Sequence, residues 1–574
     1  MIRLILAALS LVLGLVAGGL SVSALSVVGT DDVTETAPLT LDSAAHGIVF
    51  NQGLVPFEQT TATVHVKAPE GNEVFLGTAN GVDATSYLTG VAHEEITSVE
   101  FPQALGHRFV AGDTTPKSSA QSRDWWLDTS TGPEVSTTFE VGPDSPQNMV
   151  VVLPADMTST LEGAQVWATM STDGVFGFSI LGLAIALLLI GVAIFLFLHW
   201  RNSRPGVRRR RRARARAAAE EGVGARSPAT SATAGVRGPG QRDHRSSARR
   251  GRSFAALVLV PAFAVAGCTP LPVAQPHTPI LTPAERPAVR EGEAAAFLER
   301  YNWVLDEALS GGSWDVDTTM YGPLLERTRA EMAIAEAGGS EASAVPFAQV
   351  SAGGPVFSEY PMWFFAFAEP TPDSENVQVM LATRESAADD WKVPQALFIP
   401  RDQMPVLLAD GAGGVEPAPK SHVATAEKVR AQLEEYLETG KVAELDGVTI
   451  EYPTNAFTSF REYVEEFTGE DSDFDSVDVQ CTPYAGFDFS QYALSTESGS
   501  IALGEMRCSI TFSVLPDFAL DLGEQIDAVM TTGDEGNIVT INTSLPLFIN
   551  VGSDDVVRVS SPDWFLLSAE TREG

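Results

Sequence analysis

The residues of this sequence best suited to chemistry are its histidines, and they are few and poorly spaced. Eight occur in 574 residues, and only His277 and His422 follow residue 268. The segment His93-Glu94-Glu95 matches the start of the His-Glu-x-x-His zinc motif, but position 97 is Thr, so the second zinc ligand is missing. We therefore expect a turn or a strand end at this segment rather than a metal site.

The next candidate is an acidic cluster, whose carboxylate oxygens suit calcium. It comprises Asp471, Asp473, Asp475 and Asp478. A calcium loop of the EF-hand type beginning at Asp471 would have Gly at 476 and Glu at 482, and the sequence has Ser and Thr there. A solvated acidic loop is the favoured interpretation. We expect no catalytic residue, no metal site and no cofactor in this chain.

The cysteines indicate attachment and cross-linking. Cys268 ends the segment Val265-Ala266-Gly267-Cys268, which resembles a lipobox, where a bacterial lipoprotein signal is cut and the new N-terminal cysteine is acylated. Three arginines within 249–252 and the apolar stretch 254–267 precede it, as in an export signal. We therefore expect lipidation of Cys268, although the signal lies in the middle of the chain.

The other two cysteines, Cys481 and Cys508, remain as a pair in a region expected outside the cell. Both lie in segments of alternating apolar and polar residues, and in the second segment Glu505 and Arg507 are expected to face outward. An oxidising compartment favours a disulfide between the two cysteines, worth roughly 3–4 kcal/mol on the loop-entropy model. The alternative is two buried free thiols.

The net charge of -37 is strongly segregated along the chain. Residues 31–173 contain 20 acidic and four basic side chains, residues 200–253 contain 16 arginines and three acidic side chains, and the chain from 269 onward contains 51 acidic and 16 basic ones. Basic segments beside membrane spans stay in the cytoplasm. We expect a cell-membrane protein with the Arg-rich loop inside and both acidic regions outside.

Three apolar segments fit this topology. Residues 1–30 are a signal peptide or a signal anchor, and 174–199 are a transmembrane helix long enough for a bilayer core of about 30 Å. The stretch 254–268 is an internal lipoprotein signal or a third membrane segment. Its 14 apolar residues span only about 21 Å as a helix, which is typical of a signal core. The chain is then either one mature protein or two.

The Arg-rich segment 200–253 is expected to be a disordered linker, because its Arg, Ala, Gly, Ser and Pro residues offer almost nothing to bury. Nucleic-acid binding is the alternative for so basic a segment. The arginines are not interleaved with aromatic residues and belong to no recognisable binding module. We expect the lipid bilayer, and not nucleic acid, as the partner.

Residues 31–172 are expected to form an all-β sandwich, because short apolar segments alternate with turn-rich ones. Within it, VFLGTANGVDATSYLTGVAHEEITSVEF (74–101), DWWLDTSTG (124–132) and NMVVVLPAD (148–156) resemble uncharacterised actinobacterial membrane proteins with a β-rich ectodomain before a transmembrane helix. The resemblance covers about 30–200 and implies no activity.

After a Pro-rich tether, 269–288, the chain reads as two α+β halves, 289–402 and 420–574. Each has helix-spaced apolar residues followed by strands, which resembles the cone-shaped nuclear-transport-factor-2-like (ketosteroid-isomerase-like) fold of helices on a curved sheet. The segment YPMWFFAFAEP (360–370), followed by VMLATRESAADDWKVPQALFIP, resembles an actinobacterial lipoprotein domain of unknown activity. Trp363 and its aromatic neighbours are expected in the core rather than around a pocket.

These features predict a non-catalytic cell-envelope protein that binds another protein or a wall component outside the membrane. A small-molecule carrier or sensor that uses a cavity in the α+β halves is the second hypothesis. An isomerase-like enzyme with a buried carboxylate base ranks last, because no single Asp or Glu stands out in an apolar strand.

Overall fold

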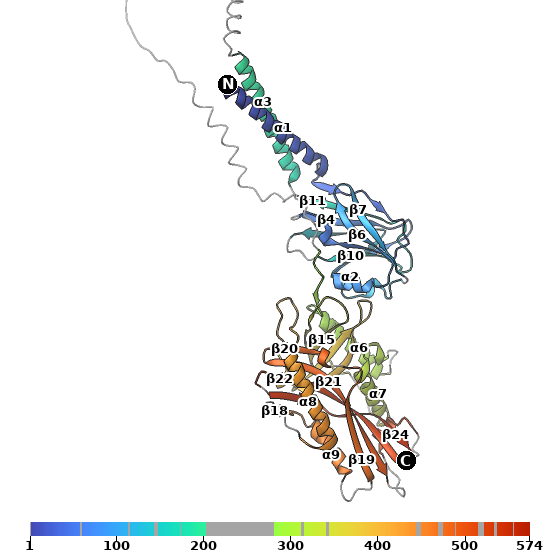
Figure 1. Ribbon diagram of the computed structural model, residues 1–574. Coiled ribbons are helices and arrows are strands. Elements are labelled where there is room, and N and C mark those ends of the chain that lie inside the picture. The colour runs from blue at the N-terminus through green and yellow to red at the C-terminus, as the bar shows by residue number, and fades with distance from the viewer. Residues whose placement is uncertain are drawn as a thin grey trace, which may run out of the picture.

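Two apolar helices, a β-rich domain and a C-terminal α+β unit follow one another along the molecule (Figure 1). The computed structural model describes residues 2–57, 60–112, 115–142, 147–172, 174–202, 281–311, 315–339, 344–442, 449–468, 474–487, 489–514, 522–532, 536–554 and 556–573. We call residues 31–172 the β-domain and residues 281–573 the C-terminal unit. The Arg-rich segment, the apolar stretch 254–267, Cys268 and most of the tether lie outside the described residues.

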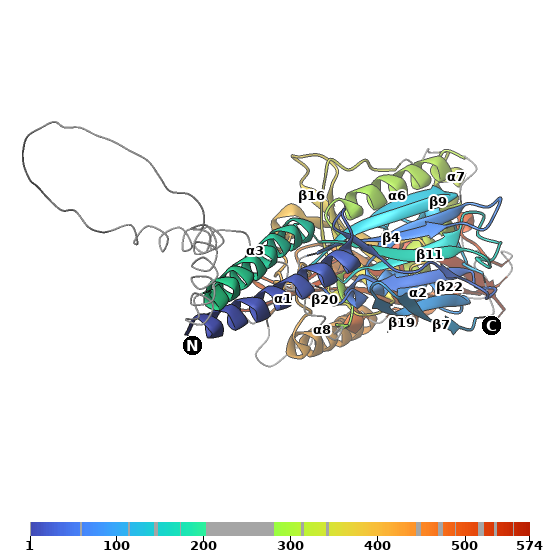
Figure 2. The ribbon, with the colours of Figure 1, turned by 90° about the horizontal axis from the view of Figure 1, so that it is seen from above.

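The two apolar helices, α1 (Ile2–Val28) and α3 (Val175–Asn202), are long and apolar enough to span a membrane. They lie side by side in both views (Figures 1 and 2). Gly14 faces Ile190 and Ser21 faces Gly182, so the helices are antiparallel. Small residues let helix backbones approach closely, which is the usual way that helices associate in lipid.

The close approach at Gly14 makes this pair testable. A Cβ atom at Gly14 would lie 2.9 Å from Ile190 Cγ1, whereas one at Gly19 would have no neighbour within 4 Å. We expect Gly14→Ile to push the helices apart and to cost about 1–3 kcal/mol, as overpacking does. Gly19→Ile is the matched control and should be neutral. Unfolding of both variants in detergent micelles by titration with dodecyl sulfate measures the difference.

The β-domain consists of two sheets that enclose one core. A five-stranded sheet has the order β1-β11-β4-β9 with β2 beside β11, and a six-stranded sheet has the order β7-β6-β3-β10-β5-β8. The strands are β1 (Val33–Glu35), β2 (Leu39–Thr40), β3 (Gly47–Asn51), β4 (Thr60–Lys67), β5 (Val74–Ala79), β6 (His93–Glu100), β7 (Ala104–Val110), β8 (Asp128–Gly132), β9 (Glu134–Val141), β10 (Met149–Pro154) and β11 (Gln165–Ser171).

The sequence pattern explains the burial of these strands. β4 alternates between buried and partly exposed residues, and its buried Val64 and Val66 meet Val150 and Val152 of β10 in one cluster. Period-2 alternation of this kind gives a strand one apolar face. The domain is not purely β, because α2 (Gly81–Tyr87) follows β5 and was not predicted from the strand patterns.

The first part of the C-terminal unit has two helices, α6 (Glu293–Leu309) and α7 (Gly322–Ala337), before an antiparallel sheet. The sheet has the order β13-β15-β16-β17, and a short pair, β12 and β14, lies beside it. The strands are β12 (Arg286–Pro287), β13 (Gln349–Gly353), β14 (Val356–Phe357), β15 (Met362–Glu369), β16 (Asn376–Arg384) and β17 (Lys392–Pro400).

In the second part, α8 (Lys420–Thr439) and α9 (Ala456–Glu466) precede all but one strand of a larger sheet, since β18 lies between the two helices in the chain. Helix α10 (Glu524–Ala528) lies between two later strands, β21 and β22. The sheet has the order β18-β23-β22-β21-β19, with β20 beside β21 and β24 beside β22. The strands are β18 (Thr449–Glu451), β19 (Phe474–Pro483), β20 (Ala493–Thr496), β21 (Gly499–Val514), β22 (Ile538–Gly552), β23 (Val556–Ser560) and β24 (Phe565–Arg572).

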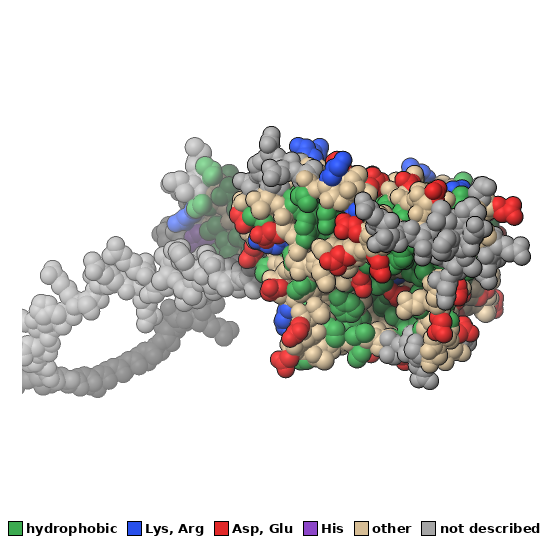
Figure 3. Space-filling model, turned by 90° about the horizontal axis from the view of Figure 1, so that it is seen from below, with side chains coloured by type: hydrophobic (Ala, Val, Ile, Leu, Met, Phe, Trp, Pro, Cys, Tyr) green, Lys and Arg blue, Asp and Glu red, His purple; other side chains and the backbone are tan. Residues whose placement is uncertain are grey.

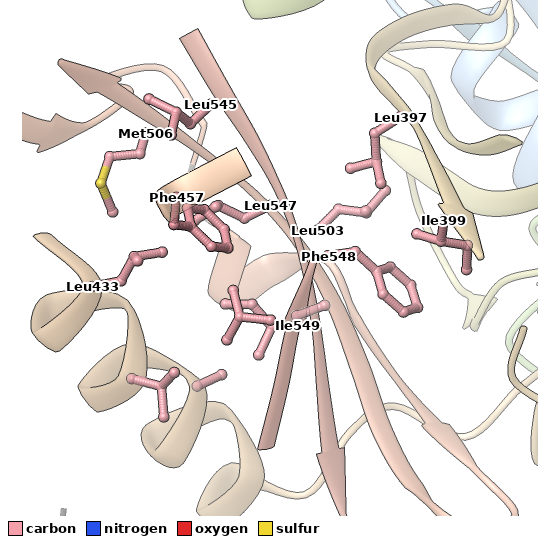
Figure 4. Packing of buried hydrophobic residues seen from close by; sticks show 14 of the residues in the cluster. Leu397, Ile399, Leu433, Phe457, Leu503, Met506, Leu545, Leu547, Phe548 and Ile549 are labelled. Carbon is pink, nitrogen blue, oxygen red and sulfur yellow. The ribbon is translucent and has the colours of Figure 1, made fainter. Parts of the chain in front are cut away.

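The two parts of the unit share one core. Leu397 and Ile399 of β17 lie in the same apolar cluster as Leu503 and Phe548 of the larger sheet (Figure 4). The smaller sheet is therefore covered on both faces. β15 shows this directly, because Phe364 packs toward α6 while Phe365 packs into the shared cluster, and both are fully buried. The aromatic residues on both faces of this strand belong to the core, as expected.

The expected disulfide is present. Cys481 of β19 and Cys508 of β21 are directly opposite each other, and their sulfurs are bonded at 2.04 Å. Both residues are 1% exposed. The bridge joins two strands that are also paired by backbone hydrogen bonds, so it reinforces the sheet.

Candidate functional site

The most elaborate polar arrangement in the molecule lies where the β-domain meets the C-terminal unit. Helix α2 carries it: the Asn80 side chain accepts from Val82 N and caps the helix, which places Asp83 in the first turn. Asp83 is 1% exposed. Its carboxylate accepts from Arg286 Nη1 at 2.6 Å and from the Tyr360 hydroxyl at 2.7 Å, and both donors belong to the C-terminal unit.

All three guanidinium nitrogens of Arg286 donate hydrogen bonds. Its Nη2 donates to Ala288 O at 3.0 Å and to Glu293 Oε2 at 3.3 Å, and its Nε donates to Pro287 O at 2.9 Å. Burial, together with the negative charge of Asp83, raises the pKa of Tyr360, so its phenol keeps the proton that it donates. A buried charge needs this degree of compensation to be tolerated.

A second ion pair crosses the same boundary. Arg384, at the end of β16, is 2% exposed and donates to Asp124 Oδ1 of the β-domain at 2.6 Å. Its guanidinium also lies 5.0 Å from the ring centroid of Trp391. Burial alone would raise the pKa of Asp124, but the charge and hydrogen bond of Arg384, with a smaller contribution from Arg123, outweigh it and hold this pKa below 3.8.

The lowered pKa of Asp124 predicts how the contact depends on pH. An acid whose pKa is depressed in the assembled state stabilises that state above its free pKa, and this contribution disappears as pH falls through the depressed value. We expect the contact to be constant between pH 5 and 8 and to weaken below about pH 4. Asp124→Asn should flatten part of this dependence. To test this pH dependence, the chain is cut by a protease between residues 202 and 281, and co-elution of the β-domain with the C-terminal unit is measured at each pH.

Apolar contacts and hydrogen bonds to the backbone also hold the β-domain against the C-terminal unit. Trp125 is fully buried, and its Nε1 donates to Ala387 O of the C-terminal unit at 2.8 Å. In return, Ala387 N donates to Ser86 Oγ of α2 at 3.0 Å. Ala387 belongs to a β-domain cluster with Tyr87, and Val82 belongs to a cluster of the C-terminal unit. Each part therefore contributes side chains to the core of the other.

We expect the contact between the β-domain and the C-terminal unit to be stable. Removing one partner of a buried ion pair typically costs about 3–5 kcal/mol, because the remaining charge stays buried and uncompensated. Separation of the parts would leave Arg286 without Asp83 and would expose Trp125 to water. We therefore expect the β-domain and the C-terminal unit to stay in contact.

A second polar cluster lies inside the C-terminal unit, and it corrects one expectation. Glu505 of β21 was expected to face outward, but it is 2% exposed. It accepts from Gln395 Nε2 at 2.8 Å and from Ser544 Oγ, and Arg507 Nε lies 3.3 Å away. β17 and α7 cover this face of the larger sheet, which the alternation of β21 alone does not reveal. Burial raises the pKa of Glu505 despite the nearby positive charge of Arg327.

The histidines and acidic residues considered from the sequence as metal ligands do not form a site in the part of the chain that the structure describes. Glu94, at the start of β6, is 2% exposed and lies 3.0 Å from His107 Nδ1, so the His93 segment is part of a strand. Asp475 and Asp478 lie on β19, whereas Asp471 and Asp473 are outside the described residues. Among the described residues, no three His, Cys, Asp or Glu side chains form a group that could hold a metal ion.

The sequence analysis did not predict this interface, although it had singled out the segments that form it. The stretches 74–101 and 124–132, recognised as characteristic of the β-domain, contain Asp83 and Trp125. The stretch from 360 onward, recognised in the C-terminal unit, contains Tyr360 and Arg384. An arginine that ends an apolar strand in so acidic a unit was a usable signal of a buried partner. What could not be read was which acidic residue it meets.

Comparison with known proteins adds one finding. Residues 285–503 match a family described as a domain of unknown function (DUF8094). The match covers less than half of the chain, and no curated protein is significantly similar to it. The matched range includes Arg286, Glu293, Tyr360 and Arg384, so the C-terminal residues of both buried ion pairs lie within it.

Proposed function

We propose that this chain is a non-catalytic cell-envelope protein in which the β-domain, anchored by α1 and α3, docks the C-terminal unit outside the membrane for binding to a protein or wall component. The observation that carries the proposal is the buried ion pair between Asp83 and Arg286, supported by the pair between Asp124 and Arg384. Such contacts fix the orientation of one part on the other.

The arrangement of the helices supports the topology. α1 leads into β1 and β11 leads into α3, and Val33 of β1 pairs with Ser171 of β11. The β-domain therefore joins both helices at one end of the pair, and Asn202 lies at the other end (Figure 1). If the helices span a bilayer, Asn202 and the β-domain are on opposite sides of it.

The interface then places Leu281 back on the side of the β-domain. Thr282 N donates to Gln147 Oε1 of the β-domain at 3.0 Å, so the chain re-enters the structure beside this domain. If α1 and α3 span a bilayer, the chain between residues 203 and 280 has to cross it again, and the sequence offers one uncharged apolar stretch there, 254–267. This requirement supports the proposal that the stretch is an export signal and that Cys268 is lipidated.

The tether is long enough for a lipidated Cys268 to stay in the membrane. The 13 steps from Cys268 to Leu281 span at most about 43–47 Å when extended. The longest strands of the β-domain have eight residues and span about 26 Å. The tether can therefore run back alongside the β-domain.

The surface of the C-terminal unit supports a role in binding. Figure 3 shows acidic side chains spread over the end of the molecule that lies opposite the helices, with few basic ones. Four of the 16 basic residues after residue 268 are buried, namely Arg286, Arg327, Arg384 and Arg461. An acidic surface repels nucleic acid and suits a basic or uncharged partner.

We also propose a fold class for the C-terminal unit and the absence of catalysis. In both parts of the unit two helices precede most strands of the sheet, which supports a nuclear-transport-factor-2-like fold. The absence of catalysis is supported by Glu505, the buried carboxylate that an isomerase-like mechanism would use as its base. Its side chain has no exposed surface and is already held by Gln395 and Ser544, so a substrate cannot reach it.

Cleavage of the linker tests the docking proposal. A protease site placed within 225–245 of the full chain allows the two parts to be separated covalently after purification in detergent. We expect an affinity tag on the N-terminal part to retain the C-terminal part after complete cleavage. Release of the C-terminal part at micromolar protein concentration and physiological salt would overturn the proposal.

A further inference from the structure

A mainly apolar pocket that is partly open to solvent lies in the C-terminal unit, away from the docking interface. It has a volume of about 270 Å³, equal to about nine water molecules at roughly 30 Å³ each. Helices α6 and α7, strand β17 and the segment around Phe565 enclose it. Leu305, Leu324, Met332 and Phe398 contribute to a wall that is mainly aliphatic and aromatic.

Two buried polar atoms in this wall lack hydrogen-bond partners among the described residues. Arg327 of α7 is 5% exposed; its Nη2 donates to Ala396 O, but its Nη1 has no acceptor. Asn302 Oδ1 of α6 also has no partner. Native proteins rarely leave such groups unsatisfied, and an orphan donor in a cavity indicates a bound water or ligand. The ring of Phe565 lies 4.8 Å from Arg327 Cζ and holds the guanidinium in place.

The charges around Arg327 leave room for an anion. No described carboxylate lies within 4.0 Å of it, although Glu505 and Glu331 act on it from further away. Glu331 lines the same cavity one helical turn from Arg327. Burial raises the pKa of Glu331, which weakens its competition for the guanidinium. An Arg fork recognises a carboxylate better than any neutral group.

We propose that this cavity binds a small apolar monocarboxylate, whose carboxylate accepts from Arg327 Nη1 and whose hydrocarbon chain lies along the apolar wall. The lining explains this class of ligand: Arg327 is its one positively charged side chain and serves one head group, and most of the remaining wall is apolar and offers van der Waals contact to a hydrocarbon chain. The site does not depend on the docking of the β-domain, since its lining comes from the C-terminal unit alone.

The experiment uses the full chain in phosphatidylcholine nanodiscs and octanoate labelled with carbon-13 in its carboxyl group. We expect a saturable carboxyl resonance that empty nanodiscs do not show. Arg327→Met should weaken this binding about tenfold or more, because a charge-assisted hydrogen bond is lost. Arg329→Met is the matched control, since Arg329 lies on the same helix, is 55% exposed and lines another cleft. It should bind octanoate like the parent.

A second variant covers the case in which Arg327→Met fails to fold. Val345 lines the cavity and is 40% exposed, so Val345→Trp fills the space without disturbing the core. It should abolish the bound resonance while thermal unfolding stays unchanged. Octylamine, which has the same chain and a positive head group, should not compete. The proposal is overturned if the parent shows no saturable resonance, if octylamine competes equally, or if the resonance survives in folded Val345→Trp.

Discussion

Asp83→Ala is expected to separate the two parts of the molecule once the linker is cut. The substitution leaves the buried Arg286 guanidinium and the hydroxyl of the half-buried Tyr360 without their shared acceptor. We expect a loss of about 3–5 kcal/mol, which is roughly two to three and a half orders of magnitude in the association constant. Arg286 keeps its contacts with Glu293 and with two backbone carbonyls, so we expect a loss near the lower end of this range. Titration of the tagged N-terminal part with the released C-terminal part measures it.

The matched control is an ion pair of the same domain that is open to solvent. Arg108 and Glu95 are 67% and 39% exposed and join β7 to β6. Exposed pairs contribute about 0–1 kcal/mol, so Glu95→Ala should leave the association within a few-fold of the parent. The double variant Asp83→Leu with Arg286→Met should recover much of the lost affinity, because it leaves no buried charge. Equal binding by Asp83→Ala and the parent would contradict this account.

The strands and helices were largely predictable because each depends on a local pattern. The apolar residues of α6 and α8 recur at helical spacing, and those of β4 alternate. Helix α2 escaped prediction because it is short, with seven residues, and lies among strands. Its signals were present, namely an Asn cap at residue 80 and an acidic residue in the first turn.

Burial from distant parts of the chain could not be predicted. Alternation in β21 correctly assigns Met506 and Cys508 to one face, but it assumes that the other face meets water. That face is covered at Glu505 by β17, more than 100 residues away in the sequence. The same limit hid the docking site. Nothing in the local pattern marks Asp83 as buried, and the position of Arg384 at the end of an apolar strand suggests a buried partner without saying which residue it is.

Cys268→Ser is expected to change the products of this gene in its native membrane completely. If the internal signal is used, the parent yields two products, and the second begins at an acylated cysteine. The variant cannot be acylated and should yield one intact chain of 61.0 kDa. Intact mass measurement after detergent extraction distinguishes these results. Replacement of both Cys481 and Cys508 by Ser is the control, since it removes the disulfide and leaves the signal unchanged.

A parent that gives one unmodified chain would contradict this prediction, and it would also raise a physical difficulty. The stretch 254–267 would then have to cross the bilayer as a helix of about 21 Å, short of a core of about 30 Å. Cleavage removes that mismatch and replaces the short helix by two acyl chains on Cys268, which are sufficient for stable anchoring. We expect the two parts to stay together after cleavage, because the Asp83–Arg286 and Asp124–Arg384 pairs join them without a covalent link. Processing would therefore add a lipid anchor to a complex whose geometry the interface has already fixed.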